Sequence, residues 1–127
     1  MLALTAPVLL IEDNDDTRGA LARLLRLRGY GVAEARNGQE AWEYFGRGER
    51  ASVIVLDLVM PRMDGRLFLA KQLENSELAA IPVVVFTAHE SGELPDVAGV
   101  VRKTDPDSLL DMIDRAAGSP RRTAHSS

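Results

Sequence analysis

A short apolar run that ends in a carboxylate constrains the fold of this chain more than any other feature. Residues 53–56 are apolar and mostly β-branched, which is typical of a strand buried on both faces of a parallel sheet. Asp57 follows directly, and the turn formers Pro61, Asp64 and Gly65 come shortly after it. Ligands of open α/β sheets bind at the carboxyl ends of the strands, so Asp57 is a candidate site residue. Taken alone, the stretch is equally consistent with a strand that merely runs into a polar loop.

Other apolar runs end in polar residues in the same way. Residues 8–11 lead to Glu12 and Asp13, residues 82–86 lead to Thr87, and residues 99–101 lead, one residue further on, to Lys103. Because the carboxyl ends of parallel strands meet at one edge of a sheet, we expect these side chains to converge on Asp57.

Helical patterns separate these runs. Capping residues, glycines and apolar spacing predict helices over residues 15–28, 38–46, 66–74 and 106–117, and a less buried edge strand over residues 31–35. In the first helix we expect a buried stripe and a solvated set of arginines. The stripe is Leu21, Leu24, Leu25 and Leu27, and the arginines are Arg18, Arg23, Arg26 and Arg28. In the third helix the expected inner residues are Leu67, Phe68, Ala70 and Leu73.

The order of elements predicts an α/β fold with a doubly wound, five-stranded parallel sheet of flavodoxin-like order 2-1-3-4-5. The connection from the fourth to the fifth strand, residues 88–98, is short and contains Gly92 and Pro95, which both oppose a regular helix. We therefore expect a shortened or missing fourth helix. Residues 1–118 are expected to form one domain and residues 119–127 a disordered tail.

Composition excludes several classes of function. The net charge of −4 gives no basic surface for direct nucleic-acid binding. The absence of cysteine excludes disulfides and thiolate metal sites, and is consistent with a cytoplasmic location. No apolar run approaches the length of a membrane span, and the first residues lack the basic region of a signal peptide, so we expect no membrane insertion.

Carboxylates that converge on one site repel one another, and Mg²⁺ bound by oxygen ligands relieves that repulsion. The site also resembles a known family, the receiver domain of bacterial two-component response regulators, over residues 6–117. The residues that carry the resemblance are Glu12, Asp13, Asp57, Pro61, Gly65, Thr87 and Lys103.

The resemblance implies specific roles. Asp13, Asp57 and the backbone carbonyl of Val59 would hold Mg²⁺, with Glu12 acting through water. Asp57 would accept a phosphoryl group from a histidine kinase or a histidine phosphotransfer protein, while the residues that contact this group would be Thr87 and Lys103. A stand-alone receiver of this kind is no enzyme beyond its own phosphorylation and dephosphorylation, and it would signal to an unknown downstream protein.

Two positions depart from the family pattern. Val100 stands where receivers usually carry Tyr or Phe, and Thr104 stands where they usually carry Pro. We therefore expect phosphorylation to act by reordering residues 88–95. A pseudo-receiver that binds partners without phosphorylation is the main alternative. A hydrolase of the haloacid-dehalogenase type is disfavoured, because that class needs a second Asp where this chain has Val59.

Overall fold

The five strands form one parallel sheet in the order β2-β1-β3-β4-β5, as the sequence predicts. The strands are β1 (Val8–Ile11), β2 (Val32–Ala35), β3 (Val53–Leu56), β4 (Val83–Thr87) and β5 (Gly99–Arg102). These bounds come from a computed structural model that describes residues 6–58, 65–88, 94 and 97–117. Every residue of β1, β3 and β4 is buried, whereas the edge strands β2 and β5 contain exposed residues. The long apolar runs therefore occupy the centre of the sheet.

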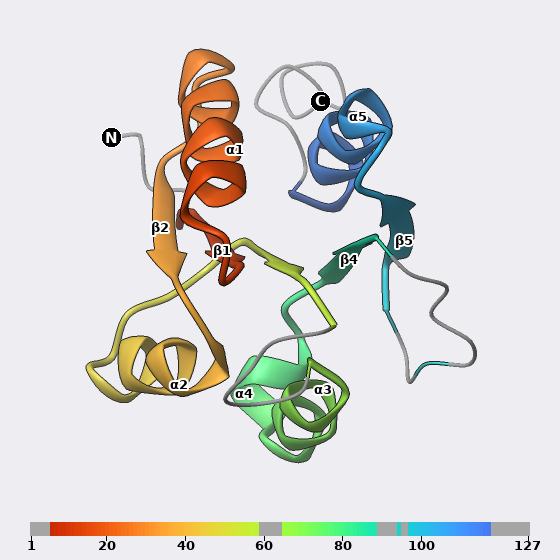
Figure 1. Cartoon of the computed structure of the whole chain (residues 1–127). Coiled ribbons are helices and arrows are strands. Elements are labelled where there is room, and N and C mark those ends of the chain that lie inside the picture. The colour runs from red at the N-terminus through yellow and green to blue at the C-terminus, as the bar shows by residue number, and fades with distance from the viewer. Residues whose placement is uncertain (1–5, 59–64, 89–93, 95–96, 118–127) are drawn as a thin grey trace, which may run out of the picture.

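Helices cover both faces of the sheet (Figure 1). On one face lie α1 (Asp15–Leu27) and α5 (Pro106–Ala117), and on the other lie α2 (Gly38–Gly46), α3 (Gly65–Glu74) and α4 (Ser76–Ala79). Each face has its own cluster of buried apolar side chains. The single-turn helix α4, which the sequence analysis does not predict, begins after Asn75, whose side chain accepts hydrogen bonds from the next turn.

The buried stripe of α1 differs from the predicted one. Leu21, Ala22 and Leu25 are buried, but Leu24 is 38% exposed and Leu27 is 77% exposed. The prediction for Leu24 and Leu27 is therefore wrong, because the helix is rotated so that Ala22 faces the sheet. This rotation also turns Arg18 inward, and its side chain is only 12% exposed. The prediction that Arg18 is solvated is wrong as well.

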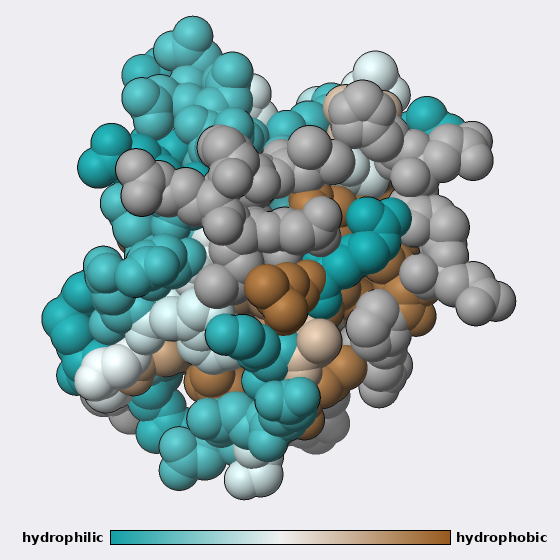
Figure 2. Space-filling model, turned by 60° about the horizontal axis from the view of Figure 1, so that its bottom comes forward, coloured by the Kyte–Doolittle hydropathy of each residue, from teal (hydrophilic) through white to brown (hydrophobic). Residues whose placement is uncertain are grey.

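A similar rotation corrects the prediction for α3. Phe68 and Leu69 are fully buried, whereas Leu67 is 49% exposed and Ala70 is exposed. Gln72 lies on the buried face, and its Nε2 donates hydrogen bonds to the backbone oxygens of the connection that leads to β4. Figure 2 looks onto the side where α2, α3 and α4 lie, and shows apolar side chains reaching the surface near the centre of this side.

The connection from β4 to β5 contains no helical residue within its described part, which is Ala88, Leu94, Val97 and Ala98. Leu94 and Val97 are partly buried against the core cluster that α2 and α3 also cover. Two apolar side chains of this connection thus extend the core on that face of the sheet. The predicted reordering of this connection concerns mainly residues 89–93 and 95–96, which lie outside the described residues, as do Gly92, Pro95 and residues 119–127.

Candidate functional site

The register of the sheet brings the predicted site residues to one edge. Ile11 pairs with Leu56, so that Glu12 and Asp57 leave neighbouring strands at the same level. The backbone N–H of Asp57 donates to the carbonyl oxygen of Ile11 at 3.1 Å, and that of Lys103 donates to the carbonyl oxygen of Thr87 at 3.0 Å. The carboxyl ends of β1, β3, β4 and β5 therefore supply the site, as the sequence analysis predicts.

Lys103 bridges two buried carboxylates. Its Nζ lies 2.6 Å from Oε1 of Glu12 and 3.2 Å from Oδ2 of Asp57. The side chains of Glu12 and Asp57 are 5% and 8% exposed, and that of Lys103 is 24% exposed. A single ammonium thus offsets two negative charges that are largely removed from water.

Burial and ion pairing shift the pKa values of Glu12 and Lys103 in opposite directions. Burial raises the pKa of the Glu12 carboxyl above its ordinary value, although the hydrogen bonds from Lys103 and from the Asn14 backbone oppose the rise. Burial alone would lower the pKa of the Lys103 ammonium, but its hydrogen bond to Glu12 and the charge of Asp57 raise it overall. The ammonium of Lys103 is therefore held in its charged form at neutral pH.

Glu12, Asp13 and Asp57 form a group that fits Mg²⁺. Each residue offers one carboxylate oxygen, and these oxygens all lie within 4.8 Å of one another. Mg²⁺ selects hard oxygen ligands and usually retains several waters, so a small set of carboxylates beside an exposed residue such as Asp13 suits this ion. The predicted fourth ligand, the backbone carbonyl of Val59, lies outside the described residues.

Thr87 and Gly65 complete the surroundings of Asp57. Thr87 ends β4 and is only 1% exposed. Gly65 begins α3 and its N–H donates to the carbonyl oxygen of Leu58 at 2.8 Å. An added Cβ at Gly65 would lie 2.6 Å from Cα of Leu58 and 2.7 Å from the backbone oxygen of Asp57. Gly65 is thus needed for the close approach of α3 to the end of β3.

We expect Gly65→Ala to lower the free energy of unfolding by about 1–3 kcal/mol, because backbone rather than a flexible side chain would have to move. Helix propensity alone predicts the opposite sign, since Ala is favoured over Gly by about 1 kcal/mol. Gly46→Ala is the matched control, as a Cβ there meets nothing within 4 Å. Chemical denaturation of both variants measures the effect, and a Gly65→Ala variant at least as stable as the parent chain would contradict it.

Sequence reasoning missed one polar residue at this edge of the sheet. Arg18 contacts the backbone of Glu12 through a hydrogen bond of 2.7 Å from its Nη1 to the carbonyl oxygen. A signal for it exists in the sequence, because Arg18 precedes the buried residues Ala22 and Leu25 at the spacing of one helix face.

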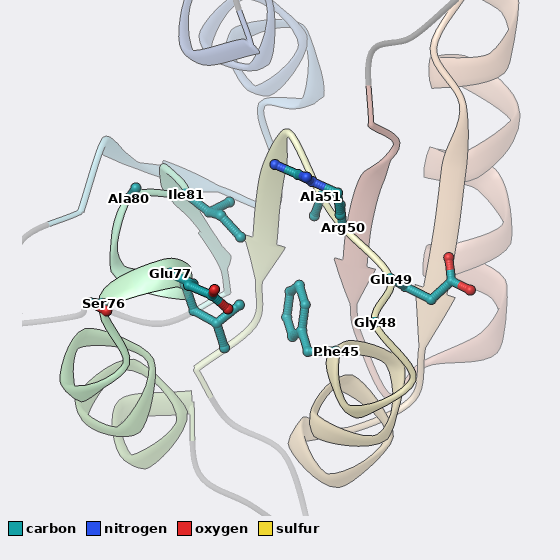
Figure 3. Close-up of a pocket in the computed structure, with 10 residues that line it drawn as sticks. Phe45, Gly48, Glu49, Arg50, Ala51, Ser76, Glu77, Ala80 and Ile81 are labelled. Atoms are coloured by element: carbon teal, nitrogen blue, oxygen red, sulfur yellow. The ribbon is translucent and has the colours of Figure 1, made fainter.

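A separate hollow of about 450 Å³ lies at the opposite edge of the sheet. It is formed by the connections that lead into β3 and β4, and Figure 3 shows Phe45 and Ile81 pointing into it while Glu49 points away. None of the predicted site residues lines this hollow. The acidic edge, with its convergent charges, is therefore the candidate functional site.

Comparison with known proteins identifies the family of this chain. Residues 8–113 match the family model of the response regulator receiver domain. The chain therefore belongs to the receiver domains of response regulators.

Several relatives share this domain. Response regulator MprA of Mycobacterium leprae is 35% identical over 121 residues, which cover 91% of this chain and 51% of the relative. The two-component response regulator-like protein APRR7 of Arabidopsis thaliana is 34% identical over 88 residues, which cover 68% of this chain and 12% of the relative. The chain thus spans about half the length of MprA and a smaller part of the plant protein.

Solved structures show the same fold. The chemotaxis protein CheY4 of Vibrio cholerae superposes with a TM-score of 0.78 at 28% identity, covering 88% of this chain and 98% of that protein. A receiver domain of a histidine kinase from Syntrophus aciditrophicus has a TM-score of 0.81 at 24% identity, covering 92% of this chain and 93% of that one. Within the part of this chain that the structure describes, no helix is long and apolar enough to cross a membrane.

Proposed function

We propose that this receiver domain takes a phosphoryl group from a phosphohistidine of a histidine kinase or histidine phosphotransfer protein onto Asp57. The observation that carries the proposal is the position of Asp57. Its carboxylate ends the central strand β3, belongs to a cluster with Glu12 and Asp13, and accepts a hydrogen bond from Lys103. Family membership supports the same role.

The proposed step is a displacement at phosphorus. A carboxylate oxygen of Asp57 forms a bond to phosphorus while the bond from phosphorus to the imidazole nitrogen of the donor breaks. The imidazole leaves with the electron pair of that bond: it leaves as a neutral ring when its other nitrogen is already protonated, and otherwise it takes up a proton from water. The product is an acyl phosphate, in which the carboxylate acts as a covalent acceptor.

The other site residues would orient the phosphoryl group and neutralise the negative charge on its oxygens. Lys103 supplies a positive charge beside Asp57, where the incoming phosphoryl oxygens carry negative charge. Thr87 ends the neighbouring strand and supplies a hydroxyl. When bound by Glu12, Asp13 and Asp57, Mg²⁺ would neutralise further charge on the phosphoryl oxygens.

Signalling requires that phosphorylation change a protein–protein interaction with a downstream partner. Val100, which replaces the usual aromatic residue, is 44% exposed on the edge strand β5. A side chain this small cannot alternate between a buried and an exposed position as Tyr can, so we assign the response to the connection between β4 and β5. On this account the chain catalyses only its own phosphorylation and dephosphorylation.

The experiment is phosphorylation by acetyl phosphate, followed by intact mass spectrometry. We expect the wild-type chain to gain one phosphoryl group in the presence of Mg²⁺ and none in EDTA. Asp13→Asn should raise the Mg²⁺ concentration for half-maximal labelling by about tenfold or more, because carboxylate charge sets the affinity of such sites.

Asp16→Asn is the matched control for this variant. Asp16 lies in the first turn of α1 and loses the same charge, but it is outside the acidic cluster. Its Mg²⁺ requirement should stay within about twofold of the wild-type value, since Asp16 is exposed to water, which screens its charge, and offers no oxygen to the cluster. Unlabelled wild-type protein would contradict the proposal and favour the pseudo-receiver alternative.

A further inference from the structure

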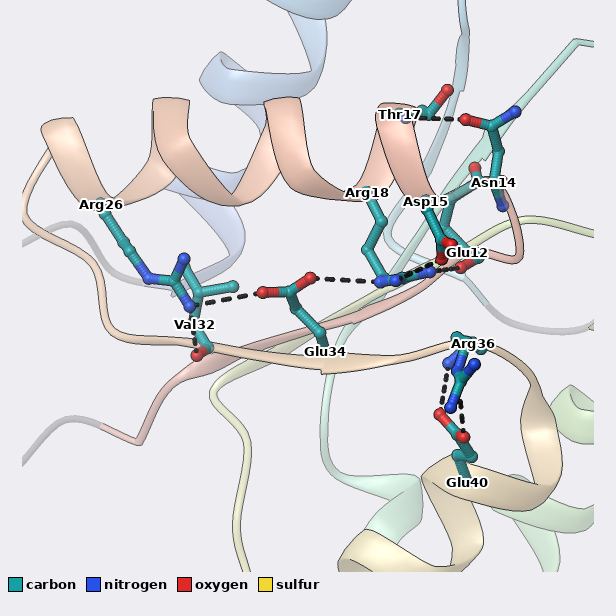
Figure 4. A network of polar contacts seen from close by, with 10 residues as sticks. All are labelled: Glu12, Asn14, Asp15, Thr17, Arg18, Arg26, Val32, Glu34, Arg36 and Glu40. Atoms are coloured by element: carbon teal, nitrogen blue, oxygen red, sulfur yellow. Dashed lines mark hydrogen bonds and ion pairs between the residues drawn. The ribbon is translucent and has the colours of Figure 1, made fainter.

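Arg18 connects three separate segments of the chain at the site edge (Figure 4). Its Nη1 donates to the backbone oxygen of Glu12 at 2.7 Å, its Nη2 to Oδ1 of Asp15 at 2.6 Å, and its Nε to Oε1 of Glu34 at 3.1 Å. These acceptors belong to the end of β1, the first turn of α1 and the edge strand β2. The planar guanidinium suits such a fixed fork of hydrogen bonds.

The acceptor on Glu12 is the carbonyl of the peptide that joins Glu12 to Asp13. The Glu12 side chain is held from the other side by Lys103 and by the Asn14 backbone. Asp13, in contrast, is exposed, and among the described residues no hydrogen bond or ion pair holds its side chain. The direction in which Asp13 presents its carboxylate therefore depends on the orientation of this peptide, to which Arg18 donates a hydrogen bond.

We propose that Arg18 is a positioning residue for the metal site: by binding the carbonyl oxygen of Glu12, it holds the Glu12–Asp13 peptide in the orientation that presents Asp13 to Mg²⁺. The inference rests on the proposed function in so far as it takes the acidic cluster to bind Mg²⁺. Residues that orient metal ligands without touching the metal commonly alter metal affinity by about 10–100-fold when they are replaced.

Whether replacement of Arg18 lowers or raises the Mg²⁺ affinity separates a positioning role from a purely electrostatic one. Arg18 carries a positive charge close to a proposed cation site, so charge alone predicts that its removal strengthens Mg²⁺ binding. Positioning predicts the opposite, because Asp13 would lose its fixed orientation. Arg18→Met keeps much of the apolar stem of the side chain and removes the guanidinium with its hydrogen bonds. The Mg²⁺ affinity of this variant therefore shows whether charge or positioning dominates.

Two matched variants isolate the contact with Glu12. Arg26 lies on the same helix and shares the acceptor Glu34, with its Nη2 3.5 Å from Oε2 of Glu34, but it binds the backbone of Val32 rather than that of Glu12. Arg26→Met thus removes the same charge without the peptide contact. Glu34→Gln weakens the ion pair of Arg18 while leaving its hydrogen bond to Glu12 in place.

The test is titration of the full chain and these variants with MgCl₂, followed by amide NMR shifts and calorimetry, with folding checked by circular dichroism. We expect the Mg²⁺ affinity of Arg18→Met to fall about tenfold or more. Arg26→Met and Glu34→Gln should stay within about twofold of the wild-type affinity, as expected for exposed ion pairs on this side of the helix. The amide signals of Asp13 and Asn14 should shift in Arg18→Met alone, even without Mg²⁺.

Unchanged or increased Mg²⁺ affinity in Arg18→Met would overturn the inference. So would an equal loss in Glu34→Gln, because that result would assign the effect to the general stability of the ion-pair network. If Arg18→Met does not fold, Arg18→Lys replaces it, and its affinity must again fall below that of Arg26→Met. Wild-type protein that binds Mg²⁺ but is not phosphorylated would contradict the proposed function alone, whereas wild-type protein that does not bind Mg²⁺ would overturn this inference too.

Discussion

Asp57→Asn is expected to abolish the incorporation of phosphate from acetyl phosphate, as measured by intact mass spectrometry. The substitution keeps the volume of a side chain that is almost fully buried at the end of β3. It removes the carboxylate oxygen that forms the bond to phosphorus, and an amide oxygen is a far weaker nucleophile. The expected loss is therefore complete, although the fold should be retained.

Glu12→Gln is the control that makes this loss specific. Glu12 and Asp57 are both buried, both belong to the acidic cluster and both contact Nζ of Lys103. Each isosteric substitution removes one negative charge from the same site. Glu12→Gln should still be labelled, at a reduced rate, because Glu12 does not accept the phosphoryl group. Equal labelling of Asp57→Asn and the wild-type chain would contradict the assignment of the acceptor.

Lys103→Met should lower the free energy of unfolding by about 2–3 kcal/mol in EDTA. Removal of one partner from a buried ion pair costs about 3–5 kcal/mol, and the partial exposure of Lys103 reduces this figure. The loss arises because Glu12 and Asp57 would remain close together without the ammonium that lies between them. Urea denaturation followed by circular dichroism measures it.

Mg²⁺ should recover most of the stability that Lys103→Met loses. A cation that binds only the folded state stabilises it. Well above the dissociation constant, the gain in the free energy of unfolding grows with the logarithm of the ratio of cation concentration to dissociation constant. The variant lacks the ammonium that competes with Mg²⁺ for the same carboxylates, so it should gain more from Mg²⁺ than the wild-type chain. Lys71→Met, at an exposed position of α3, is the control. It should change neither the free energy of unfolding in EDTA nor the stabilisation that Mg²⁺ adds. If Mg²⁺ stabilises Lys103→Met no more than the wild-type chain, the carboxylates do not form a shared cation site.

The strand ends could be predicted from the sequence because they depend on strong local signals. Apolar runs such as residues 53–56 are specific for buried parallel strands, and a parallel sheet fixes where their carboxyl ends lie. Asp57, Thr87 and Lys103 therefore converge as the sequence analysis predicts. The order of the strands followed from the same reasoning and is confirmed.

Helix rotation was harder to predict, since a difference of one residue changes which side chains are buried. In α1 the leucine spacing favoured Leu24 and Leu27, but the small residue Ala22 is the one that is buried against the sheet. The helix spacing of Arg18 with Ala22 and Leu25 indicates that it faces inward, but its contacts could not be predicted. Two of its acceptors, the Glu12 carbonyl just after β1 and the Glu34 side chain in β2, come from separate segments, and only the tertiary packing of α1 brings them together.

The most direct test of the central claim is to locate the phosphoryl group on the chain. After phosphorylation with acetyl phosphate and Mg²⁺, borohydride reduces an acyl phosphate to an alcohol and releases phosphate, so that an aspartyl phosphate becomes homoserine. Tandem mass spectrometry of the digested protein then identifies the converted residue. We expect homoserine at position 57 and nowhere else. Conversion at Glu12 or Asp13, or labelled protein in which Asp57 stays unreduced, would contradict it.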